Sequence, residues 1–379
     1  MINSQLGFSQ ENNVLPIQWE DNLILPVHDG LKENLGLSGI IGGISNSVVL
    51  FGGGCNFPDA MPWYGGKKKY YNHVYAIFSH EKEKKVVCLK EQLPENIAYS
   101  ACANMKNGIV YIGGENEMGV SDKVYMIHWN EIQQALSIKS LPSLPIKLTN
   151  ASACAIGSKI YVVGGETSKG TSSLFMMLDL YSDHLEWKYL PPIPVALSFT
   201  LAIVQSNRKD TAVYIIGGRT KTSSGHSQLH GAVYRFSFND NEWQEKKGLR
   251  DEKGMPLNIS AGFGLALDDD RIIVSSGDDG KIFAELETLN IGIDTSSIAT
   301  EKQSYFEKKL EIVTHHQGFP KKLWAYDCVK DDWNYYAPLP FAPVTTIAVK
   351  LGNELIVPCG EVKPGVRTDK IMIGDFLNR

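Results

Sequence analysis

The sequence lacks several features that would place it in a common functional class. No apolar run approaches the roughly 18 residues that a membrane span needs. The start, MINSQLGFSQENNVLP, lacks the basic head and apolar stretch of a secretory signal peptide. The net charge of −5 provides no electrostatic basis for binding nucleic acid. We therefore expect neither a membrane span nor a nucleic-acid partner.

Paired cysteines and the familiar catalytic motifs are also absent. The six cysteines are scattered without any CxxC spacing, mostly within apolar runs, which favours buried free thiols over disulfides or metal ligands. Nucleotide-binding, serine-hydrolase and zinc-protease motifs do not occur. The neighbouring His315 and His316 would diverge by about 100° on a helix and make a poor chelate. The acidic run 268–270 does not continue into a calcium loop. We expect no metal or other cofactor.

Glycine, by contrast, is abundant and recurs at the ends of apolar runs. Most of these runs lie about 50 to 60 residues apart, a spacing typical of kelch repeats, in which each repeat forms one blade of a β-propeller. The sequence therefore predicts an all-β, six-bladed kelch β-propeller as a single domain over residues 1–379. The six runs are VVLFGGG (48–54), IVYIGGE (109–115), KIYVVGGE (159–166), AVYIIGGR (212–219), RIIVSSGD (271–278) and ELIVPCGE (354–361).

The outermost strands of the repeats indicate how the ring closes. Trp187, Trp243 and Trp333 each follow a polar turn and begin a run that ends the repeat. The last repeat has no such run at its end, but the segment IQWEDNLILP (17–26) has the same tryptophan and the same Leu-Pro exit. We predict that residues 17–22 pair antiparallel beside 369–376, so that an N-terminal strand completes the C-terminal blade and leaves no open edge.

One interval breaks the period, because 83 residues separate Arg271 from Glu354. Within it, apolar residues from Tyr305 to Val313 recur at helical spacing, with lysine and glutamate between them. The pattern predicts a helical insertion over about 280–320, between the second and third strands of the fifth blade. We expect it to cover one end of the central channel, because long ordered insertions in compact folds are usually functional.

A charged residue follows the glycines in five of the six repeats. If the glycines end strands beside the propeller axis, these five side chains line the central channel and are candidates for binding a substrate. A charge after a turn is more often simply solvated, and that alternative remains open for each of them. The lysine run 67–69 is likewise expected to be a solvated loop. The five residues are Glu115, Glu166, Arg219, Asp278 and Glu361.

The last of these charges begins an unusual connection, CGEVKPGVRTDKI, between two strand-like runs. Pro364 and Gly365 suit a turn that needs φ near −65° and then a positive φ. Such a turn would hold Glu361 and Arg367 on its two flanks, near the channel. A salt bridge that braces the loop would explain the pair without any catalytic role.

The run GEVKPGVRTD, residues 360–369, resembles the motif of bacterial N-acetylneuraminate epimerases, the sialic acid mutarotases. IGGENEMG (112–119), GLSGIIGG (36–43) and the insertion containing SYFEKK are also similar to that family. The motif blade is last here rather than in the middle, so the chain resembles a cyclically permuted mutarotase group. The loop 55–72 has the place of the corresponding epimerase loop but not its sequence.

The resemblance implies an isomerase that interconverts the anomers of N-acetylneuraminate by opening and reclosing the sugar ring. It makes Glu361 and Arg367 the catalytic pair: Glu361 transfers protons and Arg367 holds the substrate carboxylate. It implies a small sugar acid as partner, no cofactor, and a periplasmic location if an export signal was removed, or otherwise a cytoplasmic one. The oligomeric state is left open.

Kelch repeats also occur in proteins with two other kinds of function. A non-catalytic kelch interaction module is the main alternative, since a propeller fold alone does not determine function. A kelch copper oxidase would need histidine ligands around the axis, and the nine histidines do not follow the glycine pairs.

Overall fold

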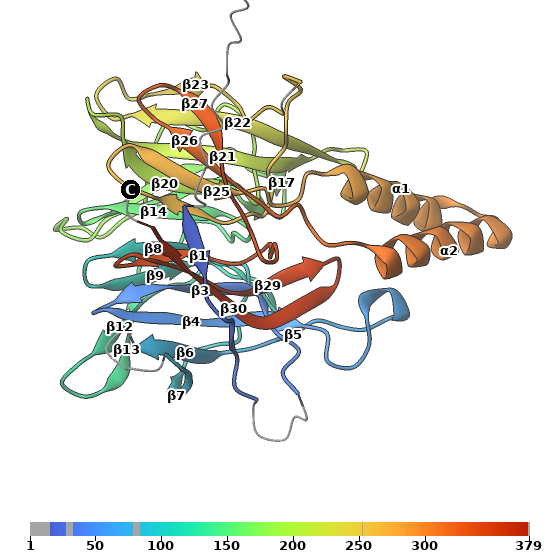
Figure 1. Cartoon of the computed structure of the whole chain (residues 1–379), viewed down its shortest axis with the longest axis horizontal. Helices are drawn as coiled ribbons and strands as arrows, with labels where there is room; N and C mark the ends of the chain where they lie inside the picture. The colour runs from blue at the N-terminus through green and yellow to red at the C-terminus, as the bar shows by residue number, and fades with distance from the viewer. Residues whose placement is uncertain (1–15, 28–32, 79–83, 252, 378–379) are drawn as a thin grey trace, which may run out of the picture.

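The computed structural model describes residues 16–27, 33–78, 84–251 and 253–377. Six antiparallel sheets of at least four strands stand around one axis (Figure 1), so the predicted six-bladed propeller is confirmed. The N-terminal segment 1–16, which lacks the pattern of a signal peptide, lies almost wholly outside the described residues. The first three blades contain β3 (Ser38–Ser45), β4 (Val48–Asn56), β6 (His73–Phe78) and β7 (Val86–Gln92); β8 (Ala101–Met105), β9 (Gly108–Ile112), β12 (Val124–Asn130) and β13 (Ala135–Leu141); and β14 (Ser152–Ile156), β15 (Lys159–Val163), β18 (Phe175–Asp179) and β19 (Lys188–Tyr189).

The fourth, fifth and sixth blades repeat this plan, with a longer central hairpin in the fourth and the sixth. Short accessory strands extend some of the loops: β5 (Lys69–Tyr70), β10 (Glu115–Asn116), β11 (Gly119–Val120), β16 (Glu166–Thr167) and β17 (Gly170–Thr171). The main strands are β20 (Leu201–Ser206), β21 (Thr211–Lys221), β22 (Ser227–Ser237) and β23 (Glu242–Lys246); β24 (Gly264–Ala266), β25 (Arg271–Ser275), β26 (Lys322–Asp327) and β27 (Asp332–Pro338); and β28 (Val349–Leu351), β29 (Glu354–Lys363) and β30 (Val366–Phe376).

The hydrophobic core lies between the blades. Among the described residues it divides into six clusters, each built from the facing sides of two neighbouring sheets. One cluster joins Val49 and Phe51 of the first blade to Ile356 and Ile371 of the last. Because a buried strand contributes apolar side chains to both of its faces, each blade packs against both of its neighbours around the ring.

The N-terminal strands complete the last blade, as predicted. β1 (Ile17–Trp19) pairs antiparallel with β30 at Phe376 to Gly374, and β2 (Leu23–Ile24) pairs with the same strand farther along. The indole of Trp19 donates a hydrogen bond to the carbonyl of Pro338 in the fifth blade, at 3.1 Å. Trp187, Trp243 and Trp333 make the same kind of bond to the blade that precedes theirs. The tryptophan pattern therefore marks equivalent outer strands, including the N-terminal one.

A closed ring of backbone hydrogen bonds surrounds the axis. In each blade, a residue at or shortly before the start of the innermost strand donates its N–H to the carbonyl of its counterpart in the preceding blade, at 2.7–3.1 Å. All six residues have positive φ, between 53° and 68°. For the five that are not glycine this backbone costs about 1–2 kcal/mol each, and the six hydrogen bonds offset that strain. The members of this hub ring are Gly39, Tyr99, Asn150, Phe199, Ala261 and Thr345.

The irregular interval forms a helical hairpin. α1 (Lys281–Thr295) and α2 (Ala299–His315) lie between β25 and β26, which confirms the insertion in the fifth blade. The hairpin extends from the same side of the propeller as the long β29–β30 hairpin (Figure 1). The carboxylate of Glu287 on α1 accepts hydrogen bonds from the backbone and the hydroxyl of Ser227, both at 2.7 Å. These contacts fix the insertion to the fourth blade.

Candidate active site

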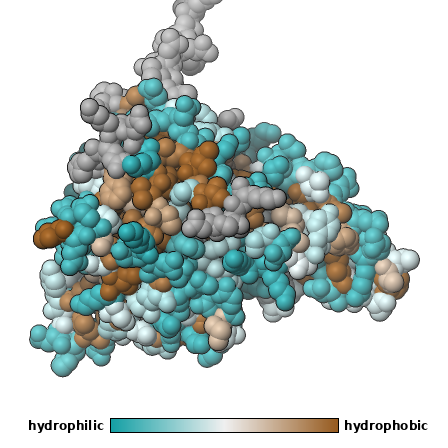
Figure 2. Space-filling model, turned by 90° about the horizontal axis from the view of Figure 1, so that it is seen from below, coloured by the Kyte–Doolittle hydropathy of each residue, from teal (hydrophilic) through white to brown (hydrophobic). Residues whose placement is uncertain are grey.

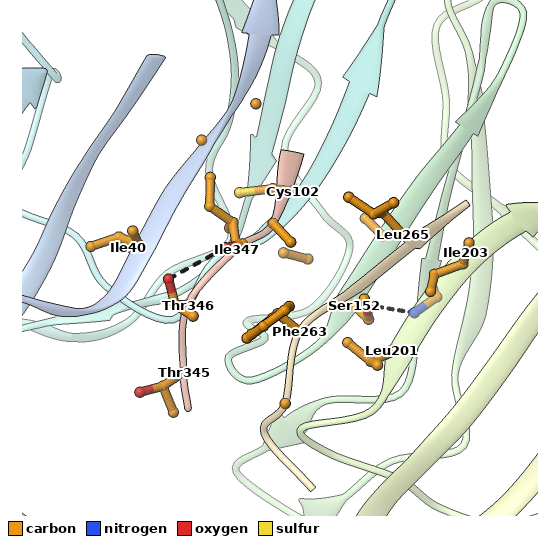
Figure 3. Close-up of a pocket in the computed structure, with 18 of the residues that line it drawn as sticks. Ile40, Cys102, Ser152, Leu201, Ile203, Phe263, Leu265, Thr345, Thr346 and Ile347 are labelled. Atoms are coloured by element: carbon orange, nitrogen blue, oxygen red, sulfur yellow. Dashed lines mark hydrogen bonds between the residues drawn. The ribbon is translucent and has the colours of Figure 1, made fainter. Parts of the chain in front are cut away.

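The hub ring separates the central channel into two cavities of about 540 Å³ each, since five of its six members line both. Figure 3 shows the cavity on the side of the innermost strands, where side chains such as Leu201, Ile203 and Leu265 come from neighbouring blades. Among the described residues that line this cavity, only Lys350 is charged. The other cavity lies beneath the helical hairpin and is rich in charge, so it is the better candidate for chemistry on a polar substrate.

All five charged residues that follow the glycine turns line this second cavity. The fold explains why, because each one forms a backbone bridge to the residue that precedes the hub-ring residue of the same blade. A position after the glycines is therefore held beside the axis in every blade. The first blade has Cys55 at this position, and its buried thiol donates to the hydroxyl of Tyr99 at 3.4 Å. All six cysteines are free, as expected, and four of them are buried.

The turn between β29 and β30 brings Glu361 and Arg367 together. They are register partners in the hairpin, and Nη2 of Arg367 lies 3.0 Å from Oε2 of Glu361. The backbone N–H of Gly365 donates to Oε1 of Glu361 at 3.3 Å, so the turn also holds the second carboxylate oxygen. Gly365 has φ of +77° and packs against Trp63, where a Cβ would lie 2.9 Å from the indole. The Lys-Pro-Gly turn therefore positions the carboxylate.

The two members of this pair differ in their access to the cavity. Glu361 lines it, and its side chain is 19% exposed. The side chain of Arg367 is only 4% exposed, stacks on Phe57 at 4.6 Å from the ring centroid, and is not among the lining residues. Nε and Nη1 of Arg367 have no hydrogen-bond partner. A ligand would therefore meet Glu361 first, and it could reach Arg367 only if the carboxylate moved.

Two carboxyl groups at this end of the cavity have raised pKa values. Burial raises the pKa of Glu361, while the Arg367 guanidinium and the Gly365 N–H act in the opposite direction. Burial also raises the pKa of Asp278 to about 6, against the stabilising hydrogen bond from the N–H of Gly280. Glu361 adds to the shift at Asp278 through its negative charge, which places the two carboxyls within electrostatic range of each other.

Glu115 belongs to a second polar group, which includes one of the run of three lysines. Nζ of Lys68 and the hydroxyl of Tyr70 both contact Oε1 of Glu115, at 3.0 and 2.9 Å. Lys68 lines the cavity and lies over the ring of Tyr99 at 4.7 Å. The expectation that residues 67–69 form a solvated loop was therefore wrong for Lys68. Sequence spacing could not reveal the contact, because it joins loops of two different blades.

Glu166 and Arg219 form a third polar group on the next two blades. Glu166 accepts hydrogen bonds from Ser198 at 2.9 Å and from Asn150 at 3.3 Å, and Nη2 of Arg219 lies 3.5 Å away. Neither Ser198 nor Asn150 stood out in the sequence. Asn150 is a member of the hub ring and Ser198 directly precedes one, so only the folded chain brings them to the axis.

The helical hairpin supplies an apolar upper wall to the cavity. Ile282, Phe283 and Leu286 of α1 face it together with Val313 of α2, and Phe319 follows after the hairpin. The cavity thus has a charged floor on the propeller and an apolar wall on the insertion. The pattern of apolar residues predicted the helix, but only the structure shows which residues of α1 face the site.

Metal binding has little support from side-chain geometry. Among the described residues, one group of three carboxylates lies close enough to share an ion: Glu20, Glu354 and Asp375. The ammonium group of Lys84 already contacts both glutamates of this group. Of the adjacent histidines, His316 lines the cavity, where burial lowers its pKa, and its Nδ1 accepts the N–H of Gly318.

Residues 141–379, more than half of the chain, match the N-acetylneuraminate epimerase family. The chain belongs to this family. N-acetylneuraminate epimerase of Haemophilus influenzae (strain PittEE) is 27% identical over 241 residues, which cover 63% of this chain and 60% of that relative. The Salmonella typhi protein of the same name is 26% identical over 234 residues, covering 61% and 57%. The match therefore spans about 60% of the length of these N-acetylneuraminate epimerases.

The solved structure of YjhT superposes on 92% of this chain and 96% of its own with a TM-score of 0.60, at 15% identity. This likeness extends the shared propeller fold beyond the segment matched to the N-acetylneuraminate epimerase family. The cyclic permutation of the blades remains a prediction. No described helix of this epimerase family member is both long and apolar enough to cross a membrane.

Proposed function

We propose that this protein interconverts the α and β anomers of N-acetylneuraminate, a sialic acid. The observation that carries the proposal is Glu361, which lines a charged cavity and lies 3.0 Å from the buried Arg367 in a member of the N-acetylneuraminate epimerase family. The cavity volume of about 540 Å³ is in the range usual for small-molecule sites. Its charged floor suits the hydroxyls of a sugar, and its apolar wall suits the methyl of an N-acetyl group.

The proposed reaction opens and recloses the ring without net change in protons. The anomeric hydroxyl gives its proton to the Glu361 carboxylate. The bond between the anomeric carbon and the ring oxygen breaks, and the ring oxygen takes up a proton, which leaves an open-chain ketone. The carbonyl turns its other face to the same hydroxyl, which attacks, and the proton transfers run in reverse. General acid–base catalysis of this type typically contributes about 10²–10⁴-fold.

The electrostatics support separate proton-transfer roles for two carboxyl groups, Glu361 and Asp278. Glu361 is desolvated, which raises its pKa towards the working pH, while Arg367 keeps its carboxylate oriented and limits the shift. In this proposal Asp278, with a pKa of about 6, exchanges the proton of the ring oxygen from the neighbouring blade. Glu115, Glu166 and Arg219 line the remaining floor and bind the substrate.

The decisive experiment follows the anomers of freshly released α-N-acetylneuraminate by NMR. The protein should accelerate their interconversion over buffer, and Glu361→Gln should reduce that acceleration by about 10²–10⁴-fold. Arg208→Gln is a matched control, because Arg208 is 73% exposed and lies outside the cavity. If the wild-type protein gives no acceleration, or if Glu361→Gln is unimpaired, the proposed function is refuted.

One observation would equally suit a non-catalytic interaction module, namely that Glu361 and Arg367 are already salt-bridged. In the view of Figure 2 the surface is largely hydrophilic, with smaller apolar clusters between the polar residues. A bracing salt bridge alone would not require the five charged residues that gather around one cavity. The catalytic proposal accounts for both features.

A further inference from the structure

The substrate proposed above carries a carboxylate on its reacting carbon, and the cavity offers several cations that could bind it. Arg367 is 4% exposed and lies behind Glu361. Lys68 is paired with Glu115 at 3.0 Å, and Lys309 reaches the cavity from α2, where burial lowers its pKa. Arg219 lines the cavity with 22% of its side chain exposed. The degree of access therefore distinguishes Arg219 from Arg367.

Two aromatic rings hold the Arg219 guanidinium. Its Cζ lies 4.3 Å from the centroid of Phe199 and 4.9 Å from that of Phe283. Phe199 belongs to the hub ring and Phe283 to α1, so the propeller and the insertion each supply one ring. Stacking restrains the plane of a guanidinium while its N–H groups stay available at the edge, which is the arrangement that two-pronged recognition of a carboxylate needs.

The hydrogen-bonding capacity of Arg219 is only partly used within the protein. Its contact to Glu166 is long, at 3.5 Å, and Glu166 is already satisfied by Ser198 and Asn150. Nε of Arg219 is buried and has no hydrogen-bond partner. A buried donor without a partner is costly, and a bound carboxylate would relieve that cost.

The position of Arg219 also fits the reacting carbon. Arg219, Asp278 and Glu361 occupy equivalent positions on three consecutive blades, and the charges of Arg219 and Glu361 both act on Asp278. A carboxylate bonded to the anomeric carbon must be held within a few ångströms of the groups that move the protons. Arg219 lies one blade from Asp278 and lines the same cavity, so it is placed to hold the carboxylate there.

We propose that Arg219, rather than Arg367, binds the carboxylate of the sugar acid, and that α1 orients this guanidinium through Phe283. The inference rests on the proposed function for the identity of the ligand. It gives the helical insertion a specific task, which is to select 2-keto sugar acids against neutral sugars. Arg367 then acts through Glu361 as a positioning residue.

The test compares an acid with its neutral counterpart. The α-methyl glycoside of N-acetylneuraminate cannot open its ring, so its binding to the full-length protein, measured by calorimetry, reports recognition without catalysis. The wild type should bind this glycoside about 10- to 100-fold more tightly than the glycoside in which a carboxamide replaces the carboxylate. Arg219→Gln should remove this preference, and should weaken binding of the acid far more than binding of the amide.

Two further variants separate the alternatives. Phe283→Leu keeps apolar volume but loses one ring, and should weaken binding of the acid by about 2- to 5-fold while leaving the amide unaffected. Lys309→Gln should keep the preference for the acid. The inference is overturned if Arg219→Gln retains that preference, if Lys309→Gln abolishes it, or if the wild type binds both glycosides equally. Failure of the proposed function would be distinct: the anomers would not interconvert faster, whatever the glycosides show.

Discussion

Replacing Glu361 should separate the structural role of its ion pair from its chemical role. The side chain of Arg367 is 4% exposed, and the carboxylate of Glu361 is its ionic partner, while Nε and Nη1 of the guanidinium have no hydrogen-bond partner. Glu361→Gln preserves the shape and an oxygen for the Gly365 N–H, but it leaves a buried cation without its counter-charge. Breaking a buried pair in this way usually costs about 3–5 kcal/mol.

The cost should be lower here, at about 2 kcal/mol, for two reasons. Glu361 is 19% exposed towards the cavity, so solvent weakens the attraction. Its raised pKa also shows that burial penalises the carboxylate itself, and the amide removes that penalty. Urea unfolding of the wild type and of Glu361→Gln at pH 7.5 measures the difference. A second change, Arg367→Met, removes the stranded charge, so the double variant should recover most of the lost stability.

Activity should respond differently from stability. The double variant Glu361→Gln/Arg367→Met should be as inactive in the NMR mutarotation assay as Glu361→Gln, because the proton-accepting carboxylate is still missing. Surface substitutions usually change the free energy of unfolding by no more than about 0.5 kcal/mol. If Glu361→Gln changes it by no more than that, the argument from the stranded buried charge is wrong. If the double variant regains mutarotation, the assignment of proton transfer to Glu361 fails.

Three other predictions concern the surroundings of the site. The folded state raises the pKa of Asp278 from 3.8 to about 6, so its protonated form contributes stability at low pH that is lost as the pH rises through 6. Asp278→Asn should therefore unfold at a higher urea concentration than the wild type at pH 8, and it should lose that advantage below pH 4. Gly365→Ala should cost about 1–2 kcal/mol in urea unfolding and lower kcat/KM, because its φ of +77° and the contact with Trp63 leave no room for a Cβ. Ile17→Ala, at a side chain 3% exposed between the fifth and sixth blades, should cost about 2–5 kcal/mol in the same assay without changing kcat/KM of the folded protein.

The sequence predicted the architecture well because its signals are local and repeated. A glycine with positive φ follows the apolar run in each blade, as one of a pair in the first four, and the outer-strand tryptophans mark the strand that borders the preceding blade. The N-terminal strand could be assigned to the last blade because its Trp19 pattern matched a part missing from the end of the chain. The charged residues after the glycines were correctly expected at the channel for the same reason.

The site was harder to predict, because its contacts join blades rather than neighbours in the chain. Lys68 was expected in a solvated loop and Phe283 was not singled out, yet each contacts a charged residue of the cavity that belongs to a different blade. The sequence also gave no reason to rank Arg367 below Arg219 as a group open to a ligand. That difference depends on which guanidinium the neighbouring loops cover.

The amino-acid sequence by itself determined the ring. The repeated apolar strands bury both faces of each sheet when the blades pack side by side in a circle, and the two end segments of the chain supply complementary parts of one blade. Only the tertiary structure decided which charges meet, which are buried and which remain open. Those outcomes depend on the hub ring and on the helical hairpin, where residues far apart in the chain come within a few ångströms and change one another's solvation.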